Sequence, residues 1–415
     1  MPEVARTVTP AEDELRAAIA AVKASNPEFG IARVLSTIRS SHGDWQVSEK
    51  RVRKFLGALG LVQSDNAGIP KSSLAPTDLA ATTGKGQVEI RYIDGTKGKG
   101  VFATQDMQPG SIVFEETPFA WYPRWDTVGA AYHLDADHEC QLCARSLDPT
   151  VVRTRVRPAK CASCGVKFCS SICKTEADMH FHKIECSKSN PAFAKLADFS
   201  RRQDQWGAPM GAVRALERVI MEFEQSTRRG REAWAGLKAF ATVSQETIDE
   251  RRFGPAWFMY QEDRENKWKA SYKLMKSALC PPPAACGLTA FDRIPAKIKE
   301  EMLSYQGWLD LLGKYCLNDQ NGGFYLLQSC FNHSCVPNCQ VSHPNSGKYR
   351  AHIEILKPIK QGEEMFITYV NPRDGVEARR KDLKDWYMFE CSCTRCQKEL
   401  QDLPKTERQE NVITI

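Results

Sequence analysis

The spacing of the cysteines is the feature that most constrains how this chain of 415 residues can fold. Eleven of the sixteen cysteines belong to groups with short spacings, which in a reducing compartment are more often metal ligands than disulfides. The other five are interpreted as small buried hydrophobic residues, namely Cys280, Cys286, Cys316, Cys330 and Cys339. The pattern therefore predicts that part of the fold depends on bound metal.

The densest group lies within residues 140–186. Its pairs are Cys140-x2-Cys143, Cys161-x2-Cys164, Cys169-x3-Cys173 and His182-x3-Cys186. Cysteine thiolates and histidine nitrogens are the ligands of tetrahedral structural zinc, so eight of them suffice for two closed sites. These 47 residues contain few aliphatic side chains, so bound metal must supply much of their folding free energy.

The overall composition is that of a soluble globular protein, with 42% hydrophobic and 26% charged residues. A length of 415 residues predicts two or three domains. No apolar run is long enough to span a bilayer, and the N-terminus lacks the apolar stretch of a signal peptide. We expect an intracellular protein of the nucleus, the cytoplasm or both, without membrane contact. The net charge of +6 does not by itself indicate a nucleic-acid binder.

Residues 1–62 are predicted to form a small helical domain. Apolar residues recur at helical spacing through Leu15 and Ile19, then over residues 31–38, and again from near Ser48. The third segment resembles the last helix of a helix-turn-helix, and its basic side chains could contact phosphates: Lys50, Arg51, Arg53 and Lys54. Basic and acidic residues are nearly balanced around it, which favours a protein-interaction module, or a solvated charged helix face, over nucleic-acid binding.

Further changes of pattern mark domain boundaries. Residues 63–87 are rich in Ser, Ala, Gly, Pro and Thr and lack periodicity, which predicts a linker. From Val88, apolar and polar residues alternate as in a half-buried strand, and Gly98 and Gly100 then allow the backbone to approach a ligand closely. Residues 187–315 show apolar residues at helical spacing and no chemical motif.

Three motifs follow near the C-terminus. The first is Asn332-His333-Ser334-Cys335-Val336-Pro337-Asn338, which combines an amide, an imidazole, a thiol and a rigid turn. The second covers residues 362–369 and alternates like a strand before it reaches Tyr369. The third is Cys391-x-Cys393-x2-Cys396, which offers three ligands and is one short of a closed zinc site.

Together these motifs resemble the C-terminal half of a SET domain, the protein lysine methyltransferase fold, and the group at 140–186 resembles a MYND finger. The chain resembles the SET–MYND (SMYD-type) lysine methyltransferases over about residues 88–400, and is most similar to shorter fungal-type members without a C-terminal helical-repeat domain. The resemblance implies an α+β fold. In that fold a mostly-β SET domain is split by an inserted MYND zinc finger and a helical insertion, and is accompanied by a post-SET zinc knuckle and the small N-terminal helical domain.

The expected domains are the helical domain 1–62, the linker 63–87, the SET N-terminal part 88–139, the MYND finger 140–186, the helical insertion 187–315, the SET C-terminal core 316–371, the post-SET region 372–400 and the tail 401–415.

The resemblance also implies which residues share a metal. MYND pairs interleave, which assigns one zinc to Cys140, Cys143, Cys169 and Cys173, and a second to Cys161, Cys164, His182 and Cys186. The gap before His182 is one residue longer than is usual in that family, so His180 is an alternative ligand. Cys335 would complete a third zinc site with Cys391, Cys393 and Cys396.

For S-adenosylmethionine, the resemblance implies a binding wall made of Lys97, Gly98, Lys99, Gly100, Asn318, Asn332, His333, Tyr369 and Phe389. Tyr369 is the implied catalytic residue, whose hydroxyl positions the substrate amine, and Tyr387 lines the lysine channel. Packing around the zinc knuckle is the alternative role for Tyr387 and Phe389, and core packing is the alternative for Tyr369.

Lysine methylation requires a neutral amine aligned with the methyl group. Alignment saves entropy, and a dry aromatic channel disfavours the ammonium form. We expect an S-adenosylmethionine-dependent protein lysine N-methyltransferase acting on histone tails or other protein lysines, with protein partners at the MYND finger. The alternative is a catalytically idle SET–MYND scaffold that binds partners in transcriptional regulation. A metal-dependent hydrolase is disfavoured, because fully ligated zinc leaves no open position.

Overall fold

The computed structural model of the chain describes residues 8–25, 31–58, 70–75, 78–94, 97–122, 139–148, 158–203, 206–344 and 349–402. The chain divides into two compact units, Met1–Ile69 and Pro70–Ile415. Among the described helices, none combines the length and the apolar character needed to cross a bilayer.

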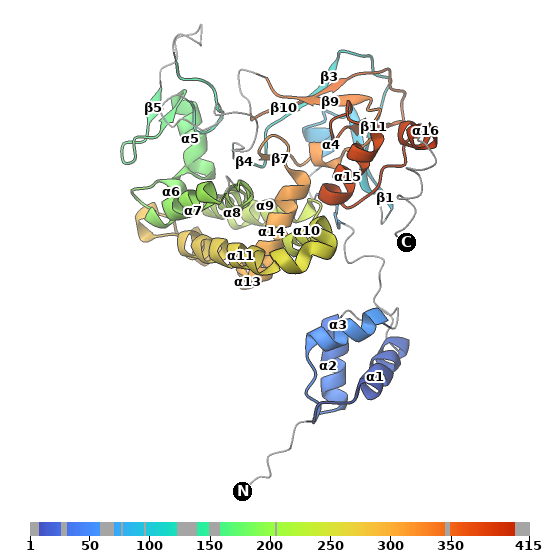
Figure 1. Ribbon diagram of the computed structural model, residues 1–415. Coiled ribbons are helices and arrows are strands. Elements are labelled where there is room, and N and C mark those ends of the chain that lie inside the picture. Colours follow the sequence, from blue (N-terminus) through green and yellow to red (C-terminus); the bar gives the residue numbers. More distant parts are fainter. Residues whose placement is uncertain are drawn as a thin grey trace. The chain divides into compact units, whose positions relative to one another are not determined.

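The N-terminal unit is a bundle of three helices, α1 (Glu12–Ser25), α2 (Ile31–Ser41) and α3 (Glu49–Ala58) (Figure 1). Its core contains Ile19, Ile38 and Phe55, each fully buried, which are the residues that the helical spacing directs to one face. The basic side chains of α3 make contacts within the unit.

Lys54 pairs with Glu12 of α1 at 3.3 Å, and Arg51 donates a hydrogen bond to the Pro10 carbonyl at 3.0 Å. The side chain of Arg53 lies outside the described residues. Two of the four side chains considered for phosphate contact therefore hold α3 against the start of α1.

The segment predicted as a linker has structure in the second unit. Lys71 pairs with Thr242 in an antiparallel bridge, with backbone N–H···O distances of 3.0 and 2.9 Å. Leu79 begins the short helix α4 (Leu79–Thr82), and its side chain is buried against the strands of the sheets. The sequence showed no sign of this structure within the predicted linker, because isolated apolar residues in a Ser- and Ala-rich stretch leave no periodicity to detect. Residues 63–69 lie outside the described residues.

Two small sheets form the centre of the second unit. The four-stranded sheet has the order β1 (Val88–Asp94), β2 (Gly98–Ala103), β11 (Glu364–Ile367), β8 (Asn332–His333), and the three-stranded sheet has the order β3 (Ile112–Glu116), β10 (Ala351–Ile355), β9 (Cys339–Ser342). The pairs are antiparallel except β8 with β11, which is parallel. Val101, Phe114, Phe331 and Met365 fill the core between these strands.

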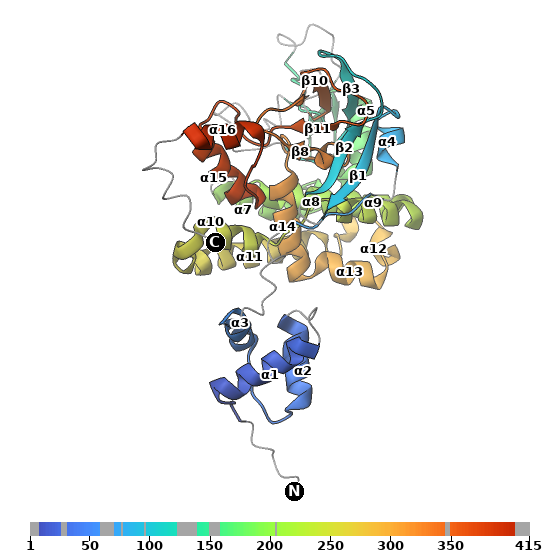
Figure 2. The same ribbon diagram turned by 90° about the vertical axis from the view of Figure 1, so that its right-hand side faces the viewer.

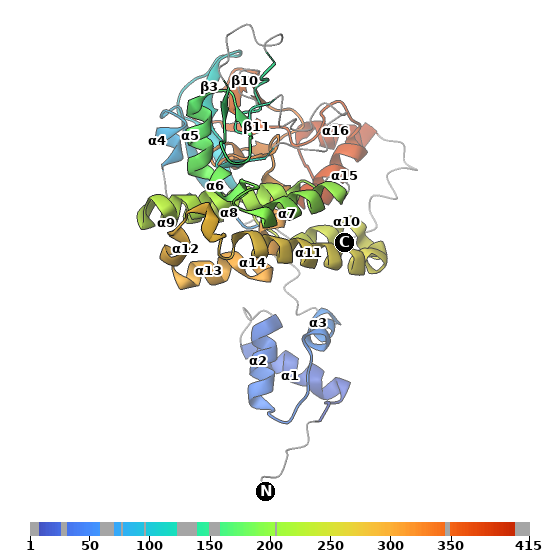
Figure 3. The ribbon, with the colours of Figure 1, turned by 90° about the vertical axis from the view of Figure 1, so that its left-hand side faces the viewer.

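A layer of helices covers one side of the strands (Figure 3). It comprises α7 (Pro191–Arg202), α8 (Ala208–Gln225), α9 (Thr227–Ala239), α10 (Gln245–Phe253), α11 (Trp257–Leu279), α12 (Ala290–Arg293), α13 (Ala296–Leu303) and α14 (Tyr305–Asn318). Helix α8 is buried on nearly all sides, as expected for a helix at the centre of such a layer, and Trp268 and Trp308 pack beside it in the same core.

The helical layer and the cysteine-rich segment are inserted between two paired strands. Strand β4 (Ala120–Trp121) pairs with β7 (Gly323–Phe324), so the chain returns to the same place after both insertions. The cysteine-rich segment carries β5 (Ala159–Lys160), β6 (Lys167–Phe168), α5 (Ser171–His180) and α6 (His182–Glu185). It lies at the opposite end of this unit from α15 (Val376–Tyr387) and α16 (Thr394–Asp402), as Figures 1 and 2 show.

One arginine holds the cysteine-rich segment to the body. Arg214 of α8 donates to both carboxylate oxygens of Glu185 in α6, at 2.6 and 2.8 Å, and to the Trp121 carbonyl in β4 at 2.9 Å. Its guanidinium also lies over the Phe181 ring, 3.5 Å from the centroid. A buried, bidentate ion pair of this kind orients the two insertions relative to the strands.

Candidate active site and metal sites

The candidate active site is built where β8 and β11 lie side by side. Asn332 and His333 are in parallel register with Phe366 and Ile367. Asn338 closes the intervening loop, since its amide nitrogen donates to the Glu364 carbonyl at 3.0 Å and its amide oxygen accepts from the Phe366 N–H at 2.7 Å. Hydrogen bonds thus join the Asn332–Asn338 motif to β11, the strand that precedes Tyr369.

Tyr369 follows β11 and is held at both its backbone and its hydroxyl. The backbone N–H donates to Nδ1 of His333 at 3.0 Å, and the hydroxyl donates to the Phe331 carbonyl at 2.5 Å. Burial, and then the neighbouring Tyr387, raise the pKa of the Tyr369 hydroxyl above its usual value, so it stays protonated at neutral pH. The Tyr369 hydroxyl is therefore neutral and held in one orientation by hydrogen bonds.

Three further rings surround Tyr369. Tyr387 lies with its ring centroid 4.7 Å away, His333 at 5.4 Å and Phe389 at 6.4 Å. Met388 ends α15 in a left-handed conformation with φ of 67°, and this turn separates Tyr387 and Phe389 so that both can contact the same tyrosine. An amine entering such an aromatic environment loses solvation, which disfavours its charged form.

The glycine-containing segment at the start of β2 joins the same site. Asn332 donates to the Lys99 carbonyl at 2.9 Å and to Oε1 of Glu364 at 2.7 Å, and Lys97 lies 3.9 Å from the same Glu364 carboxylate. Gly98 has φ of +68°, and a Cβ at Gly100 would lie 2.7 Å from the Ile93 side chain. The backbone conformation at Gly98 therefore favours glycine, whereas a side chain at Gly100 would have to displace the end of the Ile93 side chain.

Two residues predicted to bind the cofactor, Lys99 and Asn318, direct their side chains toward the helical layer. The Lys99 ammonium is buried and donates to the Ala239 carbonyl at 2.8 Å, while the Asn318 amide donates to the Ala241 carbonyl at 2.8 Å. These bonds attach the site to the last residue of α9 and to the segment that follows it. The Lys99 backbone lies with Asn332, whereas the Asn318 side chain belongs to the contact with the helical layer.

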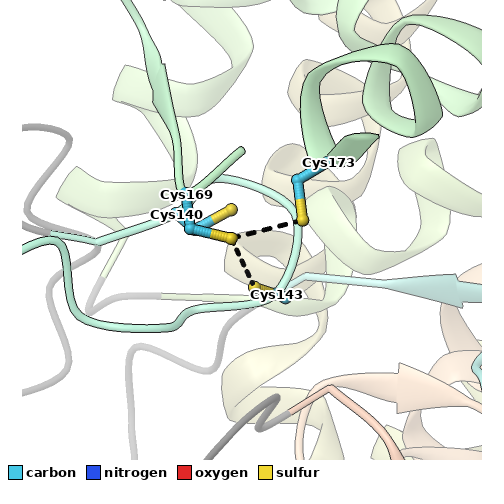
Figure 4. A group of neighbouring side chains, drawn as sticks. All are labelled: Cys140, Cys143, Cys169 and Cys173. Atoms are coloured by element: carbon cyan, nitrogen blue, oxygen red, sulfur yellow. Dashed lines mark hydrogen bonds between the residues drawn. The ribbon is translucent and has the colours of Figure 1, made fainter. Parts of the chain in front are cut away.

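The first cysteine group brings together Cys140, Cys143, Cys169 and Cys173, as expected (Figure 4). Their sulfur atoms lie within 4.8 Å of one another, and Cys169 is 3.7 Å from Cys143 and 3.4 Å from Cys173. Zn–S bonds of about 2.3 Å in a tetrahedron put sulfurs roughly 3.8 Å apart, so the group fits zinc.

The second group brings together Cys161, Cys164, His182 and Cys186. Nε2 of His182 lies 3.6 Å from the Cys164 sulfur, and its ring packs edge-on against Phe168. Because His182 begins α6 and Cys186 follows that helix directly, one turn presents both ligands on the same side. His180, the last residue of α5, is outside the group, so the geometry selects His182.

The third group joins Cys335 to Cys391, Cys393 and Cys396. The Cys335 sulfur lies 3.4 Å from that of Cys396 and 3.9 Å from that of Cys391. It also lies 3.3 Å from Nε2 of His333, which connects this group with the active site. Four sulfurs at these distances again fit a tetrahedral metal.

Sequence reasoning did not assign roles to two residues that organise the site. Asn338 belongs to the recognised motif, and its amide closes the loop after β8. Its position directly after Pro337 is a sequence signal for this role, because proline followed by asparagine is typical of a turn. Arg379 contacts the sulfur atoms of Cys335 and Cys396, yet it lies in a charged helix segment where nothing in the sequence distinguishes it.

Comparisons with known proteins agree with this geometry. The sequence model of the SET domain matches residues 98–370. Histone-lysine N-methyltransferase SET5 of Yarrowia lipolytica is 27% identical over 379 residues, which cover 90% of this chain and 78% of that protein. Protein-lysine N-trimethyltransferase SMYD5 of Mus musculus is 26% identical over 393 residues, which cover 80% of this chain and 91% of that protein.

Among solved structures, the SET domain of LSMT bound to lysine and AdoHcy aligns with a TM-score of 0.37 and 13% identity, covering 74% of this chain and about half (54%) of that one. The SET domain match spans well over half of the chain and includes the glycine segment, the Asn332–Asn338 motif and Tyr369. The chain belongs to the SET domain family, as its motifs predicted.

Proposed function

We propose that the protein is an S-adenosylmethionine-dependent protein lysine N-methyltransferase in which Tyr369 positions the amine. The observation that carries the proposal is the double anchoring of Tyr369, by His333 at its backbone and by Phe331 at its hydroxyl, within a ring of aromatic side chains. The names of the relatives, histone-lysine and protein-lysine methyltransferases, support the same reaction class.

The residues of this chain would perform three tasks. The glycine segment and the Asn332–His333 pair, which the Asn332 amide holds together, would offer backbone groups to a cofactor. When bound, S-adenosylmethionine supplies a methyl group on a good leaving group. Tyr387 and Phe389 exclude water, which favours a neutral lysine amine. The Tyr369 hydroxyl, already oriented, aligns that amine and so lowers the entropic part of the barrier.

We further propose three structural zinc ions, one in each of the described groups of four ligands. The complete ligand sets favour a structural rather than a catalytic role, because a catalytic zinc keeps one position open. The two groups in residues 140–186 would stabilise a MYND finger, and the third would hold the post-SET region against the Asn332–Asn338 motif.

Domain roles follow from this proposal. Residues 88–139 and 316–371 would form the SET domain, 187–315 the helical insertion, and 372–400 the post-SET region. The unit before Pro70 has its own core and would act as a protein-interaction module. Histone tails and other protein lysines are the proposed substrates, and the nucleus or the cytoplasm the proposed location, in line with the relatives' names.

The proposal is tested by incubating the full-length, zinc-loaded protein with methyl-labelled S-adenosylmethionine and a panel of histones and other nuclear and cytoplasmic proteins. We expect label on lysine side chains, located by mass spectrometry. The idle-scaffold alternative predicts stable binding to partner proteins without transfer. A protein that binds the cofactor but labels no lysine in extracts from cells lacking it would contradict the enzymatic proposal.

A further inference from the structure

A fully buried arginine lies beside the third cysteine group. Arg379 projects from α15 with no exposed surface. Its guanidinium donates to the Asp374 carbonyl and to the Glu399 carboxylate, the latter at 2.7 Å. The remaining contacts are with sulfur: Nε lies 3.4 Å from Sγ of Cys335, and Nη2 lies 3.6 Å from Sγ of Cys396. The guanidinium of Arg379 therefore donates to four acceptors. The Asp374 carbonyl and the Glu399 carboxylate fix its orientation toward the two sulfur atoms.

The charge of such a metal site explains why an arginine suits this position. Four thiolates around one Zn²⁺ carry a net charge of about −2, which is unfavourable in a buried environment. An arginine side chain stays protonated in proteins, so Arg379 supplies a positive charge in direct contact with two of the four sulfurs. Hydrogen bonds to thiolates favour the deprotonated, metal-binding form and fix the ligands in place.

Neighbouring arginines provide a contrast. Arg380 donates to the backbone carbonyl of Cys391 at 3.2 Å and pairs with Glu390, and Arg395 donates to the backbone carbonyl of Cys335 at 3.4 Å. These bonds hold the chain around the group. Arg379 differs from both because two of its contacts are with the sulfur atoms themselves.

The same sulfur connects the group to the candidate active site. Sγ of Cys335 lies 3.3 Å from Nε2 of His333, whose Nδ1 accepts the backbone N–H of Tyr369. A shift of Cys335 would therefore move the imidazole that holds the tyrosine.

We propose that Arg379 is a positioning residue, which stabilises zinc in the third cysteine group by donating hydrogen bonds to its thiolates and keeps Cys335 in register with His333 and Tyr369. The first part concerns metal binding alone. The second part rests on the proposed methyltransferase function.

The first part is tested by zinc release from the purified full-length protein to the chelating dye 4-(2-pyridylazo)resorcinol at neutral pH. In Arg379→Met, we expect one zinc equivalent to be released about 10- to 100-fold faster than in the wild type, the range for loss of a partner behind metal ligands. The other equivalents should keep their wild-type rates. Arg379→Lys retains the charge without the planar fork and should fall between the two.

Arg380→Met is the matched control, because it removes an adjacent arginine that bonds only to a carbonyl and a carboxylate. Its zinc release should be accelerated much less than that of Arg379→Met, because it loses a bond to a backbone carbonyl and none to a sulfur ligand. Equal release from Arg379→Met and wild type, or equal acceleration by both methionine variants, would overturn the proposal. If Arg379→Met does not fold, the comparison of Arg379→Lys with Arg380→Lys decides the same question.

The second part is tested on Arg379→Lys with a verified lysine substrate. We expect kcat to fall several-fold, because a shift of Cys335 reaches Tyr369 through His333. Faster zinc release with unchanged kcat would overturn this second part. Zinc release needs no substrate, so failure of the wild type to methylate any lysine would contradict the proposed function and leave the metal result standing.

Discussion

Nδ1 of His333 accepts a hydrogen bond from the backbone N–H of Tyr369 at 3.0 Å. An accepting nitrogen carries no proton, so the neutral ring must carry its proton on Nε2, the atom that lies 3.3 Å from the Cys335 sulfur. The histidine of the Asn332–Asn338 motif thus bridges the sulfur of a proposed zinc ligand and the proposed catalytic tyrosine.

Replacing His333 tests this bridge. His333→Ala should lower kcat about 10- to 100-fold, because the Tyr369 backbone loses its side-chain partner while the protein keeps its core. His343→Ala is the control, since that half-buried imidazole bonds to the Arg350 carbonyl and not to any residue of the candidate site. Steady-state methyl transfer measures the effect, and a kcat equal to that of the control would assign His333 to cofactor binding or packing alone.

Tyr369→Phe removes the positioned hydroxyl and keeps the ring. Methyl transfer should slow by about ten- to a thousandfold with little change in substrate and cofactor affinity, as for loss of a single positioned donor. Tyr272→Phe is the matched control, because it also removes a hydroxyl bonded to a backbone carbonyl, that of Leu303 in the helical layer. Unchanged turnover and unchanged products in Tyr369→Phe would make Tyr387 the next candidate.

Metal analysis separates the three cysteine groups. The wild type should contain three zinc ions, and Cys391→Ser and Cys161→Ser should each contain about two. Cys391→Ser should also weaken S-adenosylmethionine binding, because its group adjoins His333, whereas Cys161→Ser should disorder the finger and leave cofactor binding measurable. One zinc or fewer in undenatured wild-type protein would refute the assignment.

Shortened proteins test where the second unit begins. A chain starting at Pro70 should bind S-adenosylmethionine as tightly as the full chain, because it keeps the Lys71–Thr242 bridge and the buried Leu79. A chain starting at Ala80 loses both and should be less stable by about 2–5 kcal/mol, the usual cost of removing a buried leucine side chain. Urea unfolding and calorimetric binding measure the two effects, and equal stability of both chains would show that residues 70–79 are dispensable.

The buried ammonium of Lys314 should make stability depend on pH. Burial lowers its pKa to about 7, against a smaller opposing effect of Asp310, while the unfolded chain has the usual value near 10.4. Between these values the unfolded state binds the proton and the folded state does not, so wild-type stability gains up to about 1.4 kcal/mol per pH unit from this group as pH rises.

Lys314→Met removes this pH-dependent contribution to the free energy of unfolding. It also removes the hydrogen bond to the Leu237 carbonyl, and that loss lowers stability by a similar amount at every pH. The stability difference between Lys314→Met and wild type should therefore shift in favour of the wild type from pH 7 to pH 9 in urea unfolding. Lys238→Met, which alters a half-exposed lysine paired with Glu301, should show no such shift. Parallel pH profiles for all three proteins would mean that Lys314 has an ordinary pKa.

Local sequence patterns determined much of this description. Short spacings put two nitrogen or sulfur ligands on one turn, so the ligand pairs could be recognised in the sequence. The resemblance to SET–MYND proteins supplied the interleaving of the pairs and Cys335 as the fourth member of the third group. The alternation from Val88 predicted β1, and the string from Asn332 to Asn338 identified a SET domain through its resemblance to that family.

Only the tertiary structure decided which distant residues meet. Asn332 donates to a carbonyl 233 residues away in the sequence. Leu79 is buried against strands although no periodic pattern surrounds it, and Arg379 contacts sulfur atoms from two separate segments. Spacing along the chain carries information about neighbours on one helix or strand. Contacts between elements depend on how those elements pack, and that is fixed by the sum of many weak, non-directional apolar contacts.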